Sequence, residues 1–208
     1  TPMRFGNVCI EALSHVLPDN VVTSAEIESW LQPLYNRLRL VEGRLELMTG
    51  IRERRFWAEG MRPSEAAARA GRRALESAGV AAERIGCVLN CSVSRDALEP
   101  ATSTEVHRLL RLPDKALNFD ISNACLGVLS GMLVVAGMIE LGQIEYGLVV
   151  AAENSRPLVE STVRTLNANE KITRRTLKPH FSSLSIGSAA AGVLLASRQR
   201  STTNIRLL

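Results

Sequence analysis

The chain has 208 residues, of which 46% are hydrophobic, 22% are charged and 4% are aromatic. This composition indicates a soluble globular protein with an aliphatic core and excludes a disordered chain. The formal net charge of +4 is small, and the chain lacks the dense basic patch with interleaved aromatic residues that would indicate nucleic-acid binding.

The patterns of apolar residues, cysteines and histidines indicate whether this protein spans a membrane, forms disulfides or binds a metal. The apolar run at residues 124–139 is too short to span a bilayer and contains three glycines, so no integral membrane segment is expected. Four cysteines without a recognisable secretory signal indicate reduced thiols in a cytoplasmic protein. The three histidines are scattered and show no metal-ligand spacing, so no metal site is expected.

The first segment of the chain predicts a strand followed by a helix. Residues 5–17 alternate loosely between apolar and polar and end at a Pro-Asp-Asn turn, which is typical of a strand. Thr23, with Glu26 three residues later, is typical of a helix N-terminus. The helical pattern continues irregularly to Leu38 and includes Trp30. Because most tryptophans in helices pack in the core, we interpret Trp30 as a core residue.

A cluster of arginines follows at residues 49–57, which read TGIRERRFW. Arg52, Arg54 and Arg55 fall within four positions. Most such clusters are solvated basic turns. The alternative is a phosphate contact, because the guanidinium fork matches phosphate geometry.

The middle of the chain alternates helices with strands. Residues 63–77 form an alanine-rich helix closed by Gly79, as expected for a C-terminal cap. The continuous apolar run at 85–92 predicts a buried parallel strand. After a loop, a helix is expected at about 102–111 and a strand at 118–122. This alternation predicts an α/β fold with a mostly parallel sheet.

The stretch 119–154 is the best place in the sequence to look for chemistry. It predicts a strand, a tight turn with Cys125, an apolar helix and a second strand. The helix has no charged residue from 126 to 139, so we expect it to be buried on nearly all sides. Free backbone N–H groups at a helix N-terminus stabilise a nucleophilic thiolate. The alternative is that Cys125 is a small buried hydrophobe, as most free cysteines are.

The last third of the chain carries fewer signals. Residues 155–181 are polar and basic without strong hydrophobic periodicity, and we expect a surface excursion of helix and loop there. Residues 189–197 predict a strand. No internal repeat is visible.

Several motifs together resemble one known family. The sequence Asn-Ala-Cys-Leu-Gly at 123–127, the Thr-Gly-Ile-Arg motif at 49–52 and the strand YGLVVAAEN at 146–154 resemble the β-ketoacyl synthase III branch of the thiolase superfamily, over essentially the whole chain. Within it, the segment SVSRDALEP at 92–100 most resembles the enzymes that begin long-chain olefin synthesis by head-to-head acyl condensation. The resemblance implies that residues 1–208 form one domain, the N-terminal half of a five-layer thiolase fold.

The resemblance also implies roles for four residues. Cys125 would be the acylated nucleophile. Glu99 would be the base that removes a proton from the second acyl chain, and the family supplies it across a dimer interface. Arg52 and Trp30 would contact coenzyme A, the latter at its adenine end. Coenzyme A or acyl-carrier thioesters would be substrates, with no permanently bound cofactor.

Two features depart from the family pattern. The histidine and asparagine that work with the cysteine in this family belong to the second half, and none of the three histidines here lies in a matching context. The Gly-Asp-Gly-Ala-Gly-like motif is Ile-Gly-Ser-Ala-Ala at 186–190, without the acid. We therefore expect a homodimer, or an assembly with a chain that carries the missing half. The alternatives are a malonyl-dependent synthase III and a non-catalytic half subunit.

Overall fold

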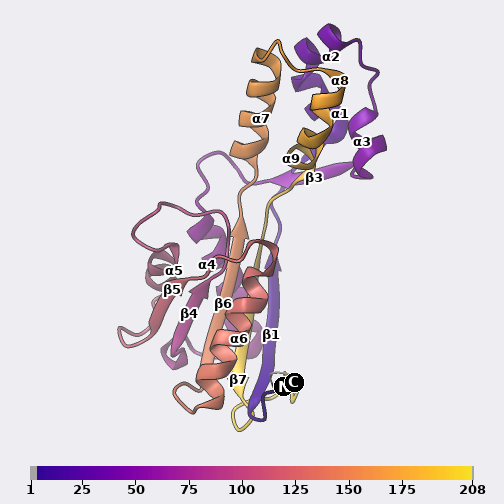
Figure 1. Cartoon of the computed structure of the whole chain (residues 1–208). Coiled ribbons are helices and arrows are strands. Elements are labelled where there is room, and N and C mark those ends of the chain that lie inside the picture. The colour runs from indigo at the N-terminus through magenta and orange to yellow at the C-terminus, as the bar shows by residue number, and fades with distance from the viewer. Residues whose placement is uncertain (1–3, 208) are drawn as a thin grey trace. The chain divides into compact units, whose positions relative to one another are not determined.

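The computed structural model describes residues 4–207, and its internal contacts group the chain into two compact units (Figure 1). The sheet unit contains the residues up to Val16, Gly60–Glu153 and the residues from Ala189. The helical unit contains Leu17–Glu59 and Asn154–Ser188. The grouping of residues 1–208 into one domain stays a prediction.

The sheet unit is built on a five-stranded sheet of order β1-β7-β6-β4-β5. β4 pairs in parallel with β5 and β6, whereas β7 pairs antiparallel with β1 and β6. Four of the five strands therefore point the same way, as predicted. The strands are β1 (Val8–Val16), β4 (Cys87–Asn90), β5 (Leu117–Asp120), β6 (Tyr146–Glu153) and β7 (Ala189–Ser197).

Helices cover both faces of this sheet. Gly71 of α4 (Pro63–Ala78) lies against Leu148 and Val150, whereas Gly131 of α6 (Gly127–Glu140) lies against Val149. Successive residues of a strand point to opposite faces, so α4 and α6 cover opposite faces (Figure 1). The sheet unit also contains α5 (Thr102–Leu110), η1 (Ala82–Arg84) and η2 (Ala124–Leu126).

Local signals predicted much of the sheet unit correctly. α4 has a proline in its first turn and ends at Gly79, whose φ is +62°. That left-handed conformation suits glycine. All four residues of β4 are buried, which agrees with the predicted buried parallel strand.

The helical unit contains a two-stranded antiparallel sheet and a set of short helices. The first helix begins after its N-cap Thr23, as predicted, and Thr23 and Glu26 form a capping box there. The helical pattern then breaks at Leu31, because Pro33 has no N–H with which to continue the hydrogen bonding. The elements are β2 (Asn20–Thr23), α1 (Ser24–Trp30), α2 (Gln32–Leu38), α3 (Arg44–Thr49), β3 (Glu53–Phe56), α7 (Arg156–Ala168), α8 (Arg174–Leu177), η3 (Lys178–His180) and α9 (Phe181–Ser185).

The predicted helix and loop at 155–181 are present, but the prediction that this segment lies on the surface is wrong. Val159, Val163 and Leu166 of α7 are buried in the core of the helical unit, together with Phe56 and Ile27. The spacing of these α7 residues, four and then three, puts them on one helical face. The polar and charged residues between them, such as Glu160 and Arg164, obscured this periodicity in the sequence.

The prediction that the apolar helix is buried on nearly all sides is also wrong for the described residues. The face of α6 that contacts the sheet is buried, and it includes Gly131 and Val135. The opposite face exposes Leu129 and Leu133 at 57% and 44%, and Leu126, the last residue of η2, is 56% exposed just before the helix. The apolar sequence of α6 predicts that both of its faces are covered, but residues 4–207 cover only the face that lies on the sheet.

Candidate active site

Cys125 lies at a strained turn between a strand and a helix. β5 ends at Asp120, and η2 leads directly into α6. Ala124 has a φ of +45°, a left-handed conformation that residues with a Cβ seldom adopt. Asn123 donates a hydrogen bond from Nδ2 to Ser130 Oγ at 2.9 Å, which ties the turn to the start of α6. This turn leaves Cys125 exposed, while the other three cysteines are buried.

Two glycines bring α6 very close to the end of β4. A Cβ built on Gly127 would lie 2.3 Å from the Cys91 carbonyl oxygen, and one on Gly131 would lie 2.5 Å from Cys91 Sγ. Only residues without a Cβ allow such an approach. The close contact therefore fixes where α6 begins, and with it the position of Cys125.

The buried thiols are poor nucleophiles by comparison. Burial raises the pKa of Cys91 to about 12 and that of Cys87 to about 11. Both thiols are therefore almost fully protonated at neutral pH. Exposure singles out Cys125 as the cysteine that a substrate can reach.

Glu99 lies in the loop between β4 and α5, which we call the Glu99 loop (residues 91–101). Its tip is open to solvent: Leu98 is 85% exposed and Glu99 is exposed. Within residues 4–207, the Glu99 side chain makes no hydrogen bond or ion pair. β4 and β5 are parallel neighbours, so the segments leading to Glu99 and to Cys125 leave the sheet at the same edge.

Buried polar groups hold the backbone at the point where β4 leads into this loop. Asn90 is fully buried, and its Oδ1 accepts a hydrogen bond from Ser92 Oγ at 2.9 Å. Ser92 Oγ in turn accepts from the Ala152 N–H at 2.6 Å. Sequence reasoning missed this arrangement, because the hydrogen bond from the Ala152 N–H comes from a residue sixty positions away in the sequence.

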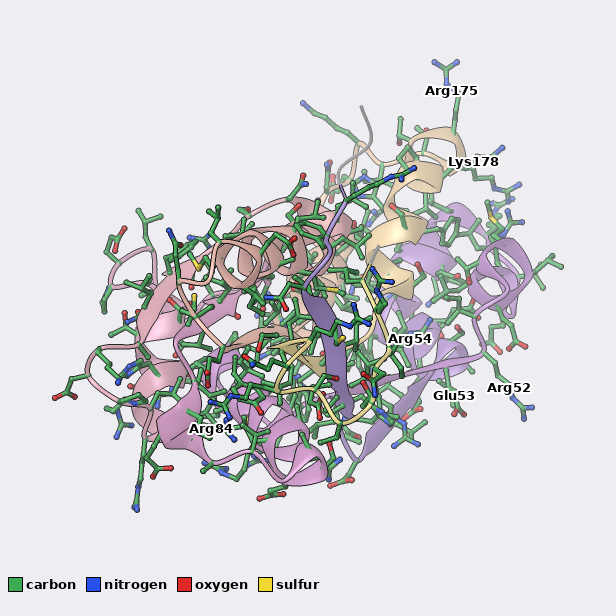
Figure 2. All side chains as sticks on the ribbon, turned by 90° about the horizontal axis from the view of Figure 1, so that it is seen from below. Arg52, Glu53, Arg54, Arg84, Arg175 and Lys178 are labelled. Atoms are coloured by element: carbon green, nitrogen blue, oxygen red, sulfur yellow. The ribbon has the colours of Figure 1, made fainter. Side chains whose placement is uncertain are left out.

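The three arginines of the TGIRERRFW segment have different environments. Arg54 is buried and donates to Ser24 Oγ at 3.0 Å, and burial lowers its pKa. Arg55 donates from Nη1 to the Pro18 carbonyl at 2.9 Å. Only Arg52 is exposed, and its side chain extends away from the ribbon (Figure 2). The expectation of a solvated turn is therefore wrong for Arg54.

Trp30 and Arg52 both belong to the helical unit. Trp30 is half-buried and packs against the core of that unit, which agrees with its interpretation as a core residue. The predicted roles of both residues toward coenzyme A stay predictions.

Residues 4–207 contain no group of three or more His, Cys, Asp or Glu side chains arranged to hold a metal ion. In the same part of the chain, no helix is long and apolar enough to cross a bilayer.

Comparison with known proteins gives a consistent set of relatives. The sequence profile of 3-oxoacyl-[acyl-carrier-protein] synthase III matches residues 119–170. An acyl-CoA:acyl-CoA alkyltransferase from Shewanella oneidensis is 39% identical over 204 residues, which are 98% of this chain and 58% of the relative. The chain therefore spans little more than half the length of that protein.

Solved structures of OleA from Xanthomonas campestris are similar to this chain. A cysteine-to-serine variant with bound lauric acid and lauroyl-CoA gives a TM-score of 0.90 at 35% identity, covering 97% of this chain and 59% of OleA. A glutamate-to-aspartate variant gives 0.89 at 36% identity, covering 95% and 60%. In OleA the substituted glutamate lies 26 positions before the substituted cysteine.

Proposed function

Because this chain belongs to the β-ketoacyl-acyl-carrier-protein synthase III branch of the thiolase superfamily, we propose that it supplies the nucleophile and the base of an enzyme that condenses two fatty acyl-CoA molecules. The similarity to the OleA structures confirms the predicted α/β thiolase fold. The activity itself is our proposal, since the chain spans only 58% of its relative.

The observation that carries the proposal is that an exposed glutamate and an exposed cysteine follow two neighbouring parallel strands at a fixed separation in the sequence. Glu99 lies 26 positions before Cys125, the same separation as between the two substituted residues of OleA. Cys125 precedes α6, whose first backbone N–H groups have no partner within the helix. Such groups stabilise a thiolate and then the oxyanion of a thioester under attack.

The first half-reaction acylates the cysteine. The Cys125 thiolate attacks the carbonyl carbon of one acyl-CoA, and the tetrahedral oxyanion collapses with loss of the coenzyme A thiolate. The product is a thioester between the acyl group and Cys125. The coenzyme A thiolate takes up a proton as it leaves.

The second half-reaction forms the carbon–carbon bond. In the proposed homodimer, the Glu99 carboxylate of one protomer removes the α-proton of a second acyl-CoA bound beside Cys125 of its partner, and the resulting carbanion attacks the acyl carbonyl on that cysteine. The cysteine thiolate leaves, and the product is a β-ketoacyl-CoA. This route needs no decarboxylation, whereas a malonyl-dependent synthase would generate its carbanion by loss of carbon dioxide.

The apolar surface at the start of α6 points to a partner for this chain. The outer face of α6 exposes Leu129 and Leu133, and Leu126 at the end of η2 is exposed beside them in the sequence. An apolar face of this kind is typical of a covered surface. We propose that the part present in longer relatives covers it and supplies the histidine and asparagine. Arg52 and Trp30 are the proposed coenzyme A contacts, and the proposed location is the cytoplasm.

Mass spectrometry of the acyl-enzyme tests the proposal. The complete enzyme, meaning this chain together with the part that its relatives add, is incubated with lauroyl-CoA and digested. We expect one lauroyl group on the peptide that contains Cys125. Cys125→Ala should abolish the label, whereas the matched variant Cys9→Ala should keep it. A label that persists in Cys125→Ala would refute the assignment.

A further inference from the structure

The Glu99 loop is tied to the start of α4 through Asp96. Asp96 Oδ1 accepts a hydrogen bond from the Ser64 N–H at 2.9 Å, and Oδ2 accepts from Ser64 Oγ. Ser64 is fully buried in the first turn of this sixteen-residue helix. The carboxylate therefore lies at the positive end of a long helix dipole, where a negative charge is stabilised.

A second contact closes the tip of the loop on itself. The Asp96 N–H donates to Thr102 Oγ1 at 3.2 Å across six positions of sequence. Glu99 lies midway between the two. Thr102 is 1% exposed, so its hydroxyl stays on the protein side of the loop.

The far end of this closed segment is fixed to the sheet. The N–H groups of Thr102 and Ser103 donate to the two carboxylate oxygens of Asp120 at 2.9 and 2.8 Å. Asp120 is the last residue of β5, five positions before Cys125. The anchor of the Glu99 loop and the turn that carries Cys125 thus start from the same strand end.

The start of the loop is held in the same manner by Glu153, at the end of β6. Its carboxylate accepts from the Val93 N–H at 2.7 Å, the Ser94 N–H at 3.0 Å and Ser94 Oγ at 2.6 Å. Between the anchored ends, residues 97–100 are exposed. The position of Glu99 is therefore set by the ends of the segment and not by contacts of its own within residues 4–207.

We propose that Asp96 and Thr102 are positioning residues for Glu99, an inference that rests on the proposed function. They close the segment 96–102 and so hold the carboxylate where the second acyl chain presents its α-proton. A proton transfer depends steeply on geometry, and a displacement of about 1 Å can cost up to ~10²-fold in rate. Acylation of Cys125 does not use Glu99, so the two half-reactions should respond differently.

A matched set of variants tests this inference on the complete enzyme. Thr102→Val keeps the shape of the side chain and removes the acceptor for the Asp96 N–H, whereas Thr102→Ser keeps the acceptor. Thr104→Val makes the same substitution two residues later on α5, where Thr104 Oγ1 donates to Asn118 Oδ1 at 3.0 Å and not to the Glu99 loop. We expect Thr102→Val to slow condensation about 10- to 100-fold, with Cys125 acylation by lauroyl-CoA within about twofold of wild type.

The conservative and control variants complete the expected pattern. Thr102→Ser should restore most of the condensation rate, and Thr104→Val should leave it unchanged. Hydrogen exchange measured by mass spectrometry should show faster exchange of the loop amides in Thr102→Val only. If Thr102→Val does not fold, Asp96→Asn takes its place, because the amide removes an acceptor for Ser64 at similar size.

The outcomes separate this inference from the proposed function. Wild-type condensation together with an unimpaired Thr102→Val or Asp96→Asn would overturn the positioning role and leave the proposed function intact. Equal losses of acylation and condensation would also overturn it, because that pattern is typical of a general loss of structure. If the wild-type enzyme acylates Cys125 but does not condense two acyl-CoA molecules, the proposed function fails, and the positioning role fails with it.

Discussion

The contact between α6 and the end of β4 can be tested by adding a single methyl group at Gly131. A Cβ there would lie 2.5 Å from Cys91 Sγ and 2.9 Å from a Val149 methyl. Both neighbours are buried, Cys91 at 3% and Val149 at 0% exposure, so neither can turn into solvent. Gly131→Ala must therefore push α6 away from the sheet. Overpacking of this kind costs about 1–3 kcal/mol.

Gly137 offers a matched control on the same helix. Apart from its two chain neighbours and the backbone of the helix itself, no atom of the described residues lies within 4 Å of a Cβ built there. Gly137→Ala should therefore stabilise the protein by about 0.5–1 kcal/mol, the usual gain of alanine over glycine inside a helix. Gly131→Ala has the same gain and the added clash. The free energies of unfolding of the two variants should thus differ by about 1–3 kcal/mol.

Urea unfolding of the two variants and the wild type provides the assay. Each kcal/mol corresponds to a shift of about 2–4 °C in Tm for a protein of this size, so thermal unfolding gives an independent check. Gly131→Ala should also slow acylation of Cys125, because the start of α6 moves with the helix. If Gly131→Ala is as stable as Gly137→Ala, the close approach of α6 to Cys91 does not exist as described.

Three further predictions concern the site and the helical unit. Glu99→Gln should slow condensation about 10²–10⁴-fold and leave acylation of Cys125 largely intact; a wild-type condensation rate would favour a malonyl-dependent synthase instead. At pH 8, iodoacetamide should modify only Cys125 in the native chain. Burial raises the pKa of Cys91 to about 12, so only a fraction of about 10⁻⁴ of this thiol is ionised at that pH. More than one adduct in the mass spectrum would contradict this prediction. Arg37→Ala should lower the free energy of unfolding in urea by about 1–2 kcal/mol, because the Arg37 guanidinium donates to three carbonyls at the end of α7. The control is Arg175→Ala, which removes an exposed side chain (Figure 2). It should change the free energy of unfolding by less than about 0.5 kcal/mol.

The sequence by itself determined the features that depend on neighbouring residues. A proline and a glycine marked the two ends of α4, and Thr23 with Glu26 marked the start of α1, because helix caps are formed within a few positions of sequence. The continuous apolar run of β4 predicted a buried parallel strand for the same reason. Cys125 could be located at a turn because a strand pattern ends before it and a continuous apolar helical run begins after it.

The tertiary structure alone decided which distant segments pack together. The core face of α7 became evident only when its apolar residues met Phe56, about a hundred positions away. Asp96 and Asp120 bond to helix N-termini on other elements, so no local pattern marks them. Burial and long-range hydrogen bonds depend on which surfaces meet in space, and hydrophobic periodicity fixes the face that a helix must cover without specifying what covers it. For this reason the sequence identified α6 as a helix in need of cover, and only the structure revealed that one of its faces is open within the described residues.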